Sequence, residues 1–262
     1  MDARLQDTSL MELRVAFENI DAILANIEKY GVTPSVMALV MHDPVMKSTL
    51  EGLQDDEILP AVEGLMDKVI DKFKSLFKKP VLRWNTYKDE MNNLNDKITE
   101  RIDKGRVTDD LEITAVDLSL HMQNMQDAVK RCEWVKTAVK KVASYKGSAS
   151  DEEATVMMAR LAYEGGELIK KVNLPPPSKT TCGRAGFPEE MNKAQEIVFE
   201  MMDSVSSHSD ATASIFRGIS RDMVRLWHKH DLAHISTLIE GYIPTILMAD
   251  LKTSFKSVVL ES

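Results

Sequence analysis

LMELRVAFENIDAILANIEKYG, residues 10–31, is the stretch that decides the fold class of this chain. Its apolar residues recur at alternating steps of three and four positions, as Leu10, Leu13, Phe17, Ile20, Leu24 and Ile27. This spacing predicts an amphipathic helix with one continuous apolar face. Gly31 is typical of the residue that ends a helix, and Thr33-Pro34 predicts the start of a second, short helix.

The same periodicity extends over most of the sequence. It predicts helices over residues 62–77, 84–105, from 109 or 110 to about 146, over 157–172, and three or four more after 188. Residues 118–132 show a coiled-coil-like seam, whereas residues 47–60 are expected to be irregular. Strand signals are nearly absent. The sequence therefore predicts an all-α protein of long amphipathic helices in an extended or bundle-like arrangement, essentially without β-sheet.

Two local signals refine the helix that ends near residue 172. Ser150 and Glu153 have the spacing of a capping box at its start. Gly165-Gly166 lies inside it and is expected to kink it, because glycine weakens a helix interior. Further along the chain, Pro244 is expected to kink the last helix in the same way.

The composition is that of an ordinary globular protein. A chain of 262 residues suffices for one large domain or two small ones, and 44% apolar with 28% charged residues argues against global disorder. Sixteen methionines beside 11 glycines and 9 prolines suit long helices with adaptable apolar seams. The net charge of −8 argues against a surface that binds nucleic acid throughout.

Residues Met1–Thr8 are polar and show no pattern of a secretory signal, and the longest apolar stretches, such as Val36–Met41, are shorter than the roughly 20 residues of a membrane span. We therefore expect no transmembrane segment, and a reducing cytoplasm in which both cysteines are thiols. Cys132 lies on the apolar seam of a helix and is expected to be a buried structural thiol. Cys182 lies in a loop beside Lys179 and Arg184, which would lower the pKa of its thiol.

Charge and proline content divide the chain into four parts. Residues 1–60 form an acidic helical leader of net charge −7, and residues 61–172 form a long-helix region with a basic amphipathic start. Residues 173–188, NLPPPSKTTCGRAGFP, are interpreted as a linker because three consecutive prolines enforce an extended chain. Residues 189–262 form a C-terminal helical region.

The basic start lies between residues 68 and 83, with six basic residues and one acid. The favoured interpretation is a core helix whose lysines are solvated. Docking on an acidic partner protein comes next, followed by contact with a membrane surface or with DNA. The candidate contact residues are Lys72, Lys74, Lys78 and Lys79.

Three histidines are the best candidates for catalysis. The sequence HDLAH places His230 and His234 four positions apart, a spacing on a helix that can chelate a metal, and Glu240 follows ten residues after His230. The pattern is similar to the HExxH motif of zinc proteases, but Asp231 replaces the glutamate that activates water. We favour solvent-facing or interface histidines, His228 included, and expect no metal or other cofactor.

Two stretches resemble internal head proteins of large tailed bacteriophages. LMELRVAFENIDAILANIEKYGVTPSVM (Leu10–Met37) resembles their amino-terminal amphipathic helix and the glycine turn that follows it. Ala61–Leu65, followed by the basic helix DKVIDKFKSLFKKP, resembles their processed region, from which a prohead protease removes an acidic leader. That protease cuts after a glutamate preceded two residues earlier by a small or aliphatic residue, which makes Glu63 the candidate processing site.

The resemblance implies a non-enzymatic virion or prohead structural protein, made in the host bacterial cytoplasm and located in the virion. It would act through helix–helix contacts with itself or with other virion proteins, and residues 68–83 would lie near DNA. The residues predicted for assembly are Leu10, Leu13, Phe17, Ile20 and Leu24. Two alternatives remain open: a helical binding or adaptor module in the infected cell, and a metal-dependent hydrolase that uses His230 and His234.

Overall fold

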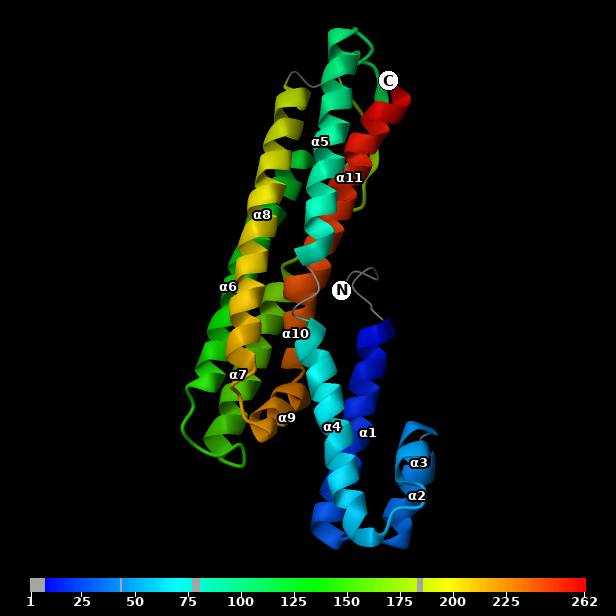
Figure 1. Ribbon diagram of the computed structural model, residues 1–262. Helices are drawn as coiled ribbons and strands as arrows, with labels where there is room; N and C mark the ends of the chain where they lie inside the picture. The colour runs from blue at the N-terminus through cyan, green and yellow to red at the C-terminus, as the bar shows by residue number, and fades with distance from the viewer. Residues whose placement is uncertain (1–7, 43, 77–80, 183–185) are drawn as a thin grey trace. The chain divides into compact units, whose positions relative to one another are not determined.

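A computed structural model describes residues 8–42, 44–76, 81–182 and 186–262 (Figure 1). The structure is 78% helical, which confirms the predicted all-α class. A small antiparallel sheet of two short strands is the exception. The chain divides into two compact units, and the division falls at Leu76.

The N-terminal unit is a helical unit built around the contact between its first and last helices. The structure describes it as α1 (Thr8–Tyr30), α2 (Pro34–His42), α3 (Pro44–Leu50) and α4 (Asp55–Leu76). The predicted end of α1 is confirmed, since Gly31 follows it with a φ of +73°. The predicted start of α2 is confirmed as well, because the Thr33 hydroxyl accepts a hydrogen bond from the Val36 amide at 3.3 Å.

The expectation that residues 47–60 are irregular is wrong. Helix α3 continues to Leu50, and α4 already begins at Asp55 with three acidic residues in its first turn, where the helix dipole favours them. Pro60 lies inside α4 and does not end it. The helix persists there because the apolar side chains on its inner face are fully buried, with Ile58 1% and Val62 0% exposed.

The second unit is built on long helices that lie side by side, α6 along α8 and α5 along α11 (Figure 1). Its elements are α5 (Val81–Asp103), β1 (Glu112–Ala115), α6 (Leu118–Ala143), α7 (Glu152–Lys170), β2 (Ser178–Thr181), α8 (Phe187–Phe216), α9 (Arg221–Lys229), α10 (Leu232–Thr237), a π-helical turn (Leu238–Tyr242) and α11 (Ile243–Glu261). Both α6 and α8 carry many buried apolar residues. They include Cys132, Val135, Val139, Val198, Met202 and Val205.

The two strands occupy segments that the sequence assigned to a helix and to a linker. Glu112 of β1 lies opposite Thr181 of β2, and Ala115 lies opposite Ser178. The predicted helix therefore starts at Leu118 rather than at residue 109 or 110, and the Asp117 side chain caps it by accepting from the Leu120 amide at 3.0 Å.

Two serines of α11 accept hydrogen bonds from backbone amides at β1 and just after it. The Thr114 amide donates to Ser257 Oγ at 2.7 Å, and the Val116 amide donates to Ser254 Oγ at 3.1 Å. These bonds give strand amides the partners that a neighbouring strand would otherwise supply. These serines lie more than a hundred residues further along the chain, so no sequence pattern near residue 112 predicts the strand.

The Pro-rich segment 173–188 does not separate two domains. It contains β2, which pairs with β1. Helix α6, earlier in the chain, and helix α8, which follows the segment, pack on each other within one unit. The structure thus places its division at Leu76, whereas the sequence placed boundaries at residue 60 and at this segment.

Helix α7 passes through Gly165-Gly166 and begins after Asp151, which replaces the predicted Ser150 as the N-cap residue. Gly165 serves close packing: a Cβ atom there would lie 2.5 Å from the Trp134 ring of α6 and 2.7 Å from Ile235 of α10. The absence of a side chain at Gly165 therefore lets three helices approach closely.

The C-terminal stretch Leu232–Glu261 is a run of helix in three parts, and its irregular turn, Leu238–Tyr242, comes just before Pro244. The Ile243 amide bonds to the Leu238 carbonyl, five residues back, as in a π-helix. By length and composition alone this run could cross a membrane, but 61% of its apolar window is buried inside the unit. Its burial against α5, α6 and β1 marks it as a core helix.

Candidate functional site

The residues predicted for assembly lie on α1, and three of them are used inside the N-terminal unit. Phe17 is 2% exposed, Ile20 6% and Leu24 2%, and α1 packs on α4. The side chains of Leu10 and Leu13 lie outside the described residues. The described part of this stripe therefore forms the core of its own unit and offers no surface to a partner.

The predicted basic contact lies at the end of α4. The backbone of Lys72 and Lys74 belongs to α4, but their side chains are outside the described residues, as are Lys78 and Lys79 entirely. Contact with DNA or an acidic partner through these lysines stays a prediction.

Glu63, the candidate processing site, lies in the middle of α4 and is partly buried. The residue before it, Val62, is fully buried, so Glu63 lies next to the packed face of α4. A protease binds its substrate as an extended chain, and α4 must therefore open locally, or be cut before it folds, for the bond after Glu63 to be reached.

The candidate metal-binding histidines are not on one helix. His230 ends α9, Asp231 has a left-handed φ of +63°, and His234 lies in the separate helix α10. The sequence interpretation that HDLAH forms one helical face is wrong, because the chain turns at Asp231. Within the described residues no group of three His, Cys, Asp or Glu side chains is placed to hold a metal ion.

Glu240 lies in the π-helical turn and is only 3% exposed. Neither carboxylate oxygen makes a well-formed hydrogen bond. Burial raises the pKa of Glu240 to about 8, against a smaller opposite effect of the Thr212 hydroxyl on α8. The group is thus a neutral acid at pH 7, and the π-helical turn places it in the core rather than at an open cleft.

Cys132 of α6 is fully buried, as predicted, and its thiol points to the Ile239 carbonyl at 3.7 Å. Burial raises the pKa of the Cys132 thiol, and the nearby Glu240 carboxyl raises it further. Nucleophilic cysteines need the opposite shift. The pair of Cys132 and Glu240 is therefore built as a neutral core cluster rather than as a nucleophile and its base.

Cys182 follows β2, and its side chain is buried rather than exposed in a loop. Burial raises the pKa of its thiol, so Lys179 does not lower it as the sequence suggested. Arg184 itself lies outside the described residues.

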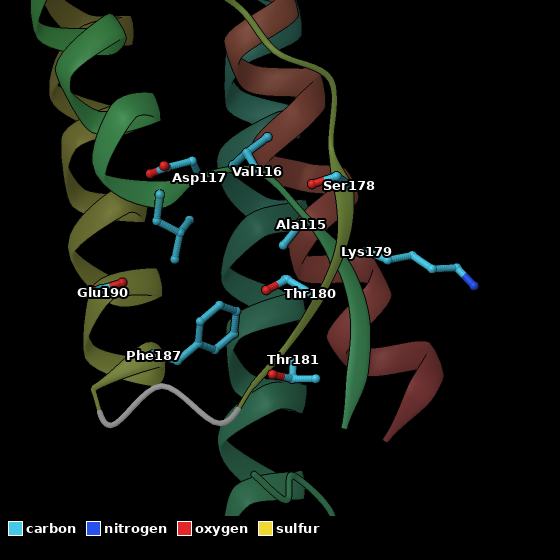
Figure 2. Close-up of a pocket in the computed structure, with 10 residues that line it drawn as sticks. Ala115, Val116, Asp117, Ser178, Lys179, Thr180, Thr181, Phe187 and Glu190 are labelled. Atoms are coloured by element: carbon cyan, nitrogen blue, oxygen red, sulfur yellow. The ribbon is translucent and has the colours of Figure 1, made fainter. Parts of the chain in front are cut away.

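A pocket of about 230 Å³ opens where the two strands meet the first turns of α6 and α8. Figure 2 shows the Phe187 ring directed toward β2, while the Lys179 side chain extends away from α6 and α8. Asp117, on the pocket wall, is already used as a helix cap. A binding site usually combines an apolar wall with several convergent polar groups, and here the charged groups do not converge.

No protein-family model matches the chain, and neither the curated proteins nor the solved structures gave a match. The resemblance of Leu10–Met37 and of Ala61–Leu65 with the basic helix that follows to phage internal head proteins therefore stays a prediction.

Proposed function

We propose that this chain is a non-enzymatic structural protein of a tailed bacteriophage head, which acts in the virion or prohead through helix–helix contacts. The resemblance of Leu10–Met37 and Ala61–Leu65 to internal head proteins motivates the proposal. The observation that carries it is the place of Glu63, which lies in the small N-terminal unit and outside the larger second unit.

A cut after Glu63 would dismantle one unit and spare the other. It would separate α1 from the second half of α4, the helix on which α1 packs. The second unit has a buried core of its own, which includes Trp84 of α5, Val139 of α6 and Val198 of α8. The N-terminal unit therefore has the organisation of a removable leader.

The charge distribution agrees with such a leader. Residues 1–63 contain 4 basic and 12 acidic groups and carry the whole net charge of −8. The residues from Gly64 onward are neutral overall, with 29 of each. A neutral product is less strongly repelled by DNA phosphates than the full chain, which suits a protein packed inside a head.

Of the two alternatives, the metal-dependent hydrolase has no support in the described residues, because the turn at Asp231 separates His230 from His234. A helical adaptor of the infected cell shares the all-helical fold and differs in location. It predicts a protein present in the lysate and missing from particles.

Mass spectrometry of purified particles and of the infected-cell lysate tests the proposal. We expect peptides of the second unit in particles at an abundance comparable to other head proteins, enriched over host cytoplasmic proteins. The Glu63→Gln variant should keep its leader. Glu28→Gln is the matched control, since Asn26 stands two residues before it, and should be processed normally. A chain confined to the lysate would contradict the proposal.

A further inference from the structure

Helix α7 carries two apolar seams on opposite sides. The inner seam packs on the second unit and consists of Ala154, Met158, Leu161, Gly165 and Ile169, all buried. The outer seam faces solvent and consists of Val156, Ala159, Tyr163 and Gly166. Val156 is 60% and Tyr163 69% exposed, which makes them two of the few large apolar side chains that the described surface leaves open.

The outer seam has the spacing of a coiled coil and a charge at each end. Glu152 precedes it and Lys170 follows it, so that six positions are separated by four, three, four, three and four residues. At about 100° per residue all six fall within an arc of about 80°. Such a face pairs with another helix along its whole length.

We propose that the outer seam of α7 docks on the same seam of a second copy of this chain, antiparallel and related by a two-fold axis at the level of Leu161. Two-fold contacts use one patch twice, so the patch must complement itself. The seam meets this condition in both charge and shape.

In this register each large side chain faces a small one. Val156 faces Gly166 of the second copy, where a Cβ atom would have nothing within 4 Å, and Tyr163 faces Ala159 of the second copy. Alternation of large and small residues across facing positions is what lets two helices interdigitate. Because of the symmetry, each of these pairs occurs twice.

The opposite charges at the two ends of the outer seam favour a second copy of this chain as the partner, bound in the antiparallel direction. Glu152 of one chain would face Lys170 of the other at both ends of the contact, whereas parallel helices would set Glu152 against Glu152 and Lys170 against Lys170. Lys170 now bonds the exposed Glu167 at 2.7 Å, a surface pair that costs little to exchange. On the flank, Arg160 and Glu164 already pair at 2.9 Å and add no net charge.

The contact is small, since the 19 residues of α7 span about 28 Å. Interfaces at this low end of the size range bind weakly, and we expect a dissociation constant of roughly 1–100 µM. The inference concerns the purified full-length protein and holds whether or not the chain is part of a phage particle, so its failure leaves the proposed function standing.

Sedimentation velocity of the full-length protein from about 1 to 300 µM tests the proposal. Wild type should shift from monomer to dimer across this range. Tyr163→Glu should weaken the dimer at least about tenfold, because it places a carboxylate in the apolar centre of the seam. Leu260→Glu is the control, since Leu260 is another exposed apolar residue (79%) that lies near the end of a different helix, α11, and this variant should dimerise like wild type.

A charge exchange tests the direction. Glu152→Lys and Lys170→Glu should each weaken the dimer, and the double variant should restore it, with circular dichroism confirming an unchanged helix content. A monomer up to 300 µM, or a dimer indifferent to Tyr163→Glu, would overturn the proposal. Equal weakening by the single and double charge variants would overturn the antiparallel register.

Discussion

The carboxyl group of Glu240 is buried among the helices of the second unit and is protonated at neutral pH. The sequence shows it only as a single acid within the apolar run LIEGYIPTI, and sequence reasoning considered it only as a third metal ligand in the disfavoured hydrolase alternative. Its burial depends on the turn at Asp231, on the packing of α6 and on the nearby Thr212 of α8, which no local pattern encodes.

This burial makes stability depend on pH. The unfolded carboxyl ionises near its ordinary pKa of 4.5, whereas the folded one holds its proton up to about pH 8. Between these values the unfolded state binds fewer protons, so the free energy of unfolding falls as pH rises. Above about pH 8 the carboxyl is ionised in both states, so it causes no further fall in the free energy of unfolding.

Glu240→Gln should remove this penalty, because an amide stays neutral at every pH. We expect the free energy of unfolding at pH 7 to rise by about 3 kcal/mol, with no gain near pH 4. Urea unfolding at both pH values measures it. Glu200→Gln on the exposed side of α8 is the control and should change nothing. A gain of equal size at both pH values would show that Glu240 is not protonated by burial.

Substitutions of the neighbouring residues Gly165 and Gly166 should change stability in opposite directions. Gly165→Ala should destabilise the fold by about 1–3 kcal/mol, because its Cβ atom meets the Trp134 ring and Ile235. Gly166→Ala meets nothing within 4 Å and should stabilise α7 by up to about 1 kcal/mol through helix propensity. Thermal unfolding at a concentration below that of dimerisation compares them. Destabilisation by both variants would show that Gly165-Gly166 is a required kink.

At the scale of elements, helix periodicity predicted most of what the structure contains. Gly31 and Thr33 set helix ends through local bonds, and the sequence shows them correctly. Elements fixed by distant partners were missed: β1 depends on Ser254 and Ser257, and the first turns of α4 depend on buried apolar contacts that override Pro60. The outer seam of α7 can be read from the sequence, because apolar and small residues from Val156 to Gly166 also recur at steps of three and four. It was missed because the inner seam of the same helix contains more large apolar residues.

The dependence of β1 on α11 predicts a specific loss. Ser254→Ala removes the acceptor of the buried Val116 amide and should lower the free energy of unfolding by about 1–3 kcal/mol. Thr253→Ala is the control, because the exposed Thr253 hydroxyl bonds only the Ala249 carbonyl of its own helix. Denaturant unfolding gives both values, and hydrogen exchange should show faster exchange of the Val116 amide in Ser254→Ala alone. Unchanged exchange there would contradict the role given to Ser254.

At the scale of the whole molecule, two helical units divide the chain at Leu76, and the net charge is concentrated in the smaller one. The sequence predicted the acidic leader but not its extent, because charge marks a boundary near residue 60 while the core of the unit continues through α4 to Ile70. Phe17, Ile20 and Leu24 were predicted to contact another chain and instead lie in the core of their own unit, for a related reason. A helical stripe shows that a face is buried, and it does not show whether the burying partner lies in the same chain.

We propose that the chain enters a phage head and loses its acidic leader there. Measuring the intact mass of the protein extracted from purified particles tests it most directly. We expect a chain whose first residue is Gly64, and we expect the uncut form in the Glu63→Gln variant. Particles that lack the chain would contradict the structural function, and particles that hold only the full-length chain would contradict its processing.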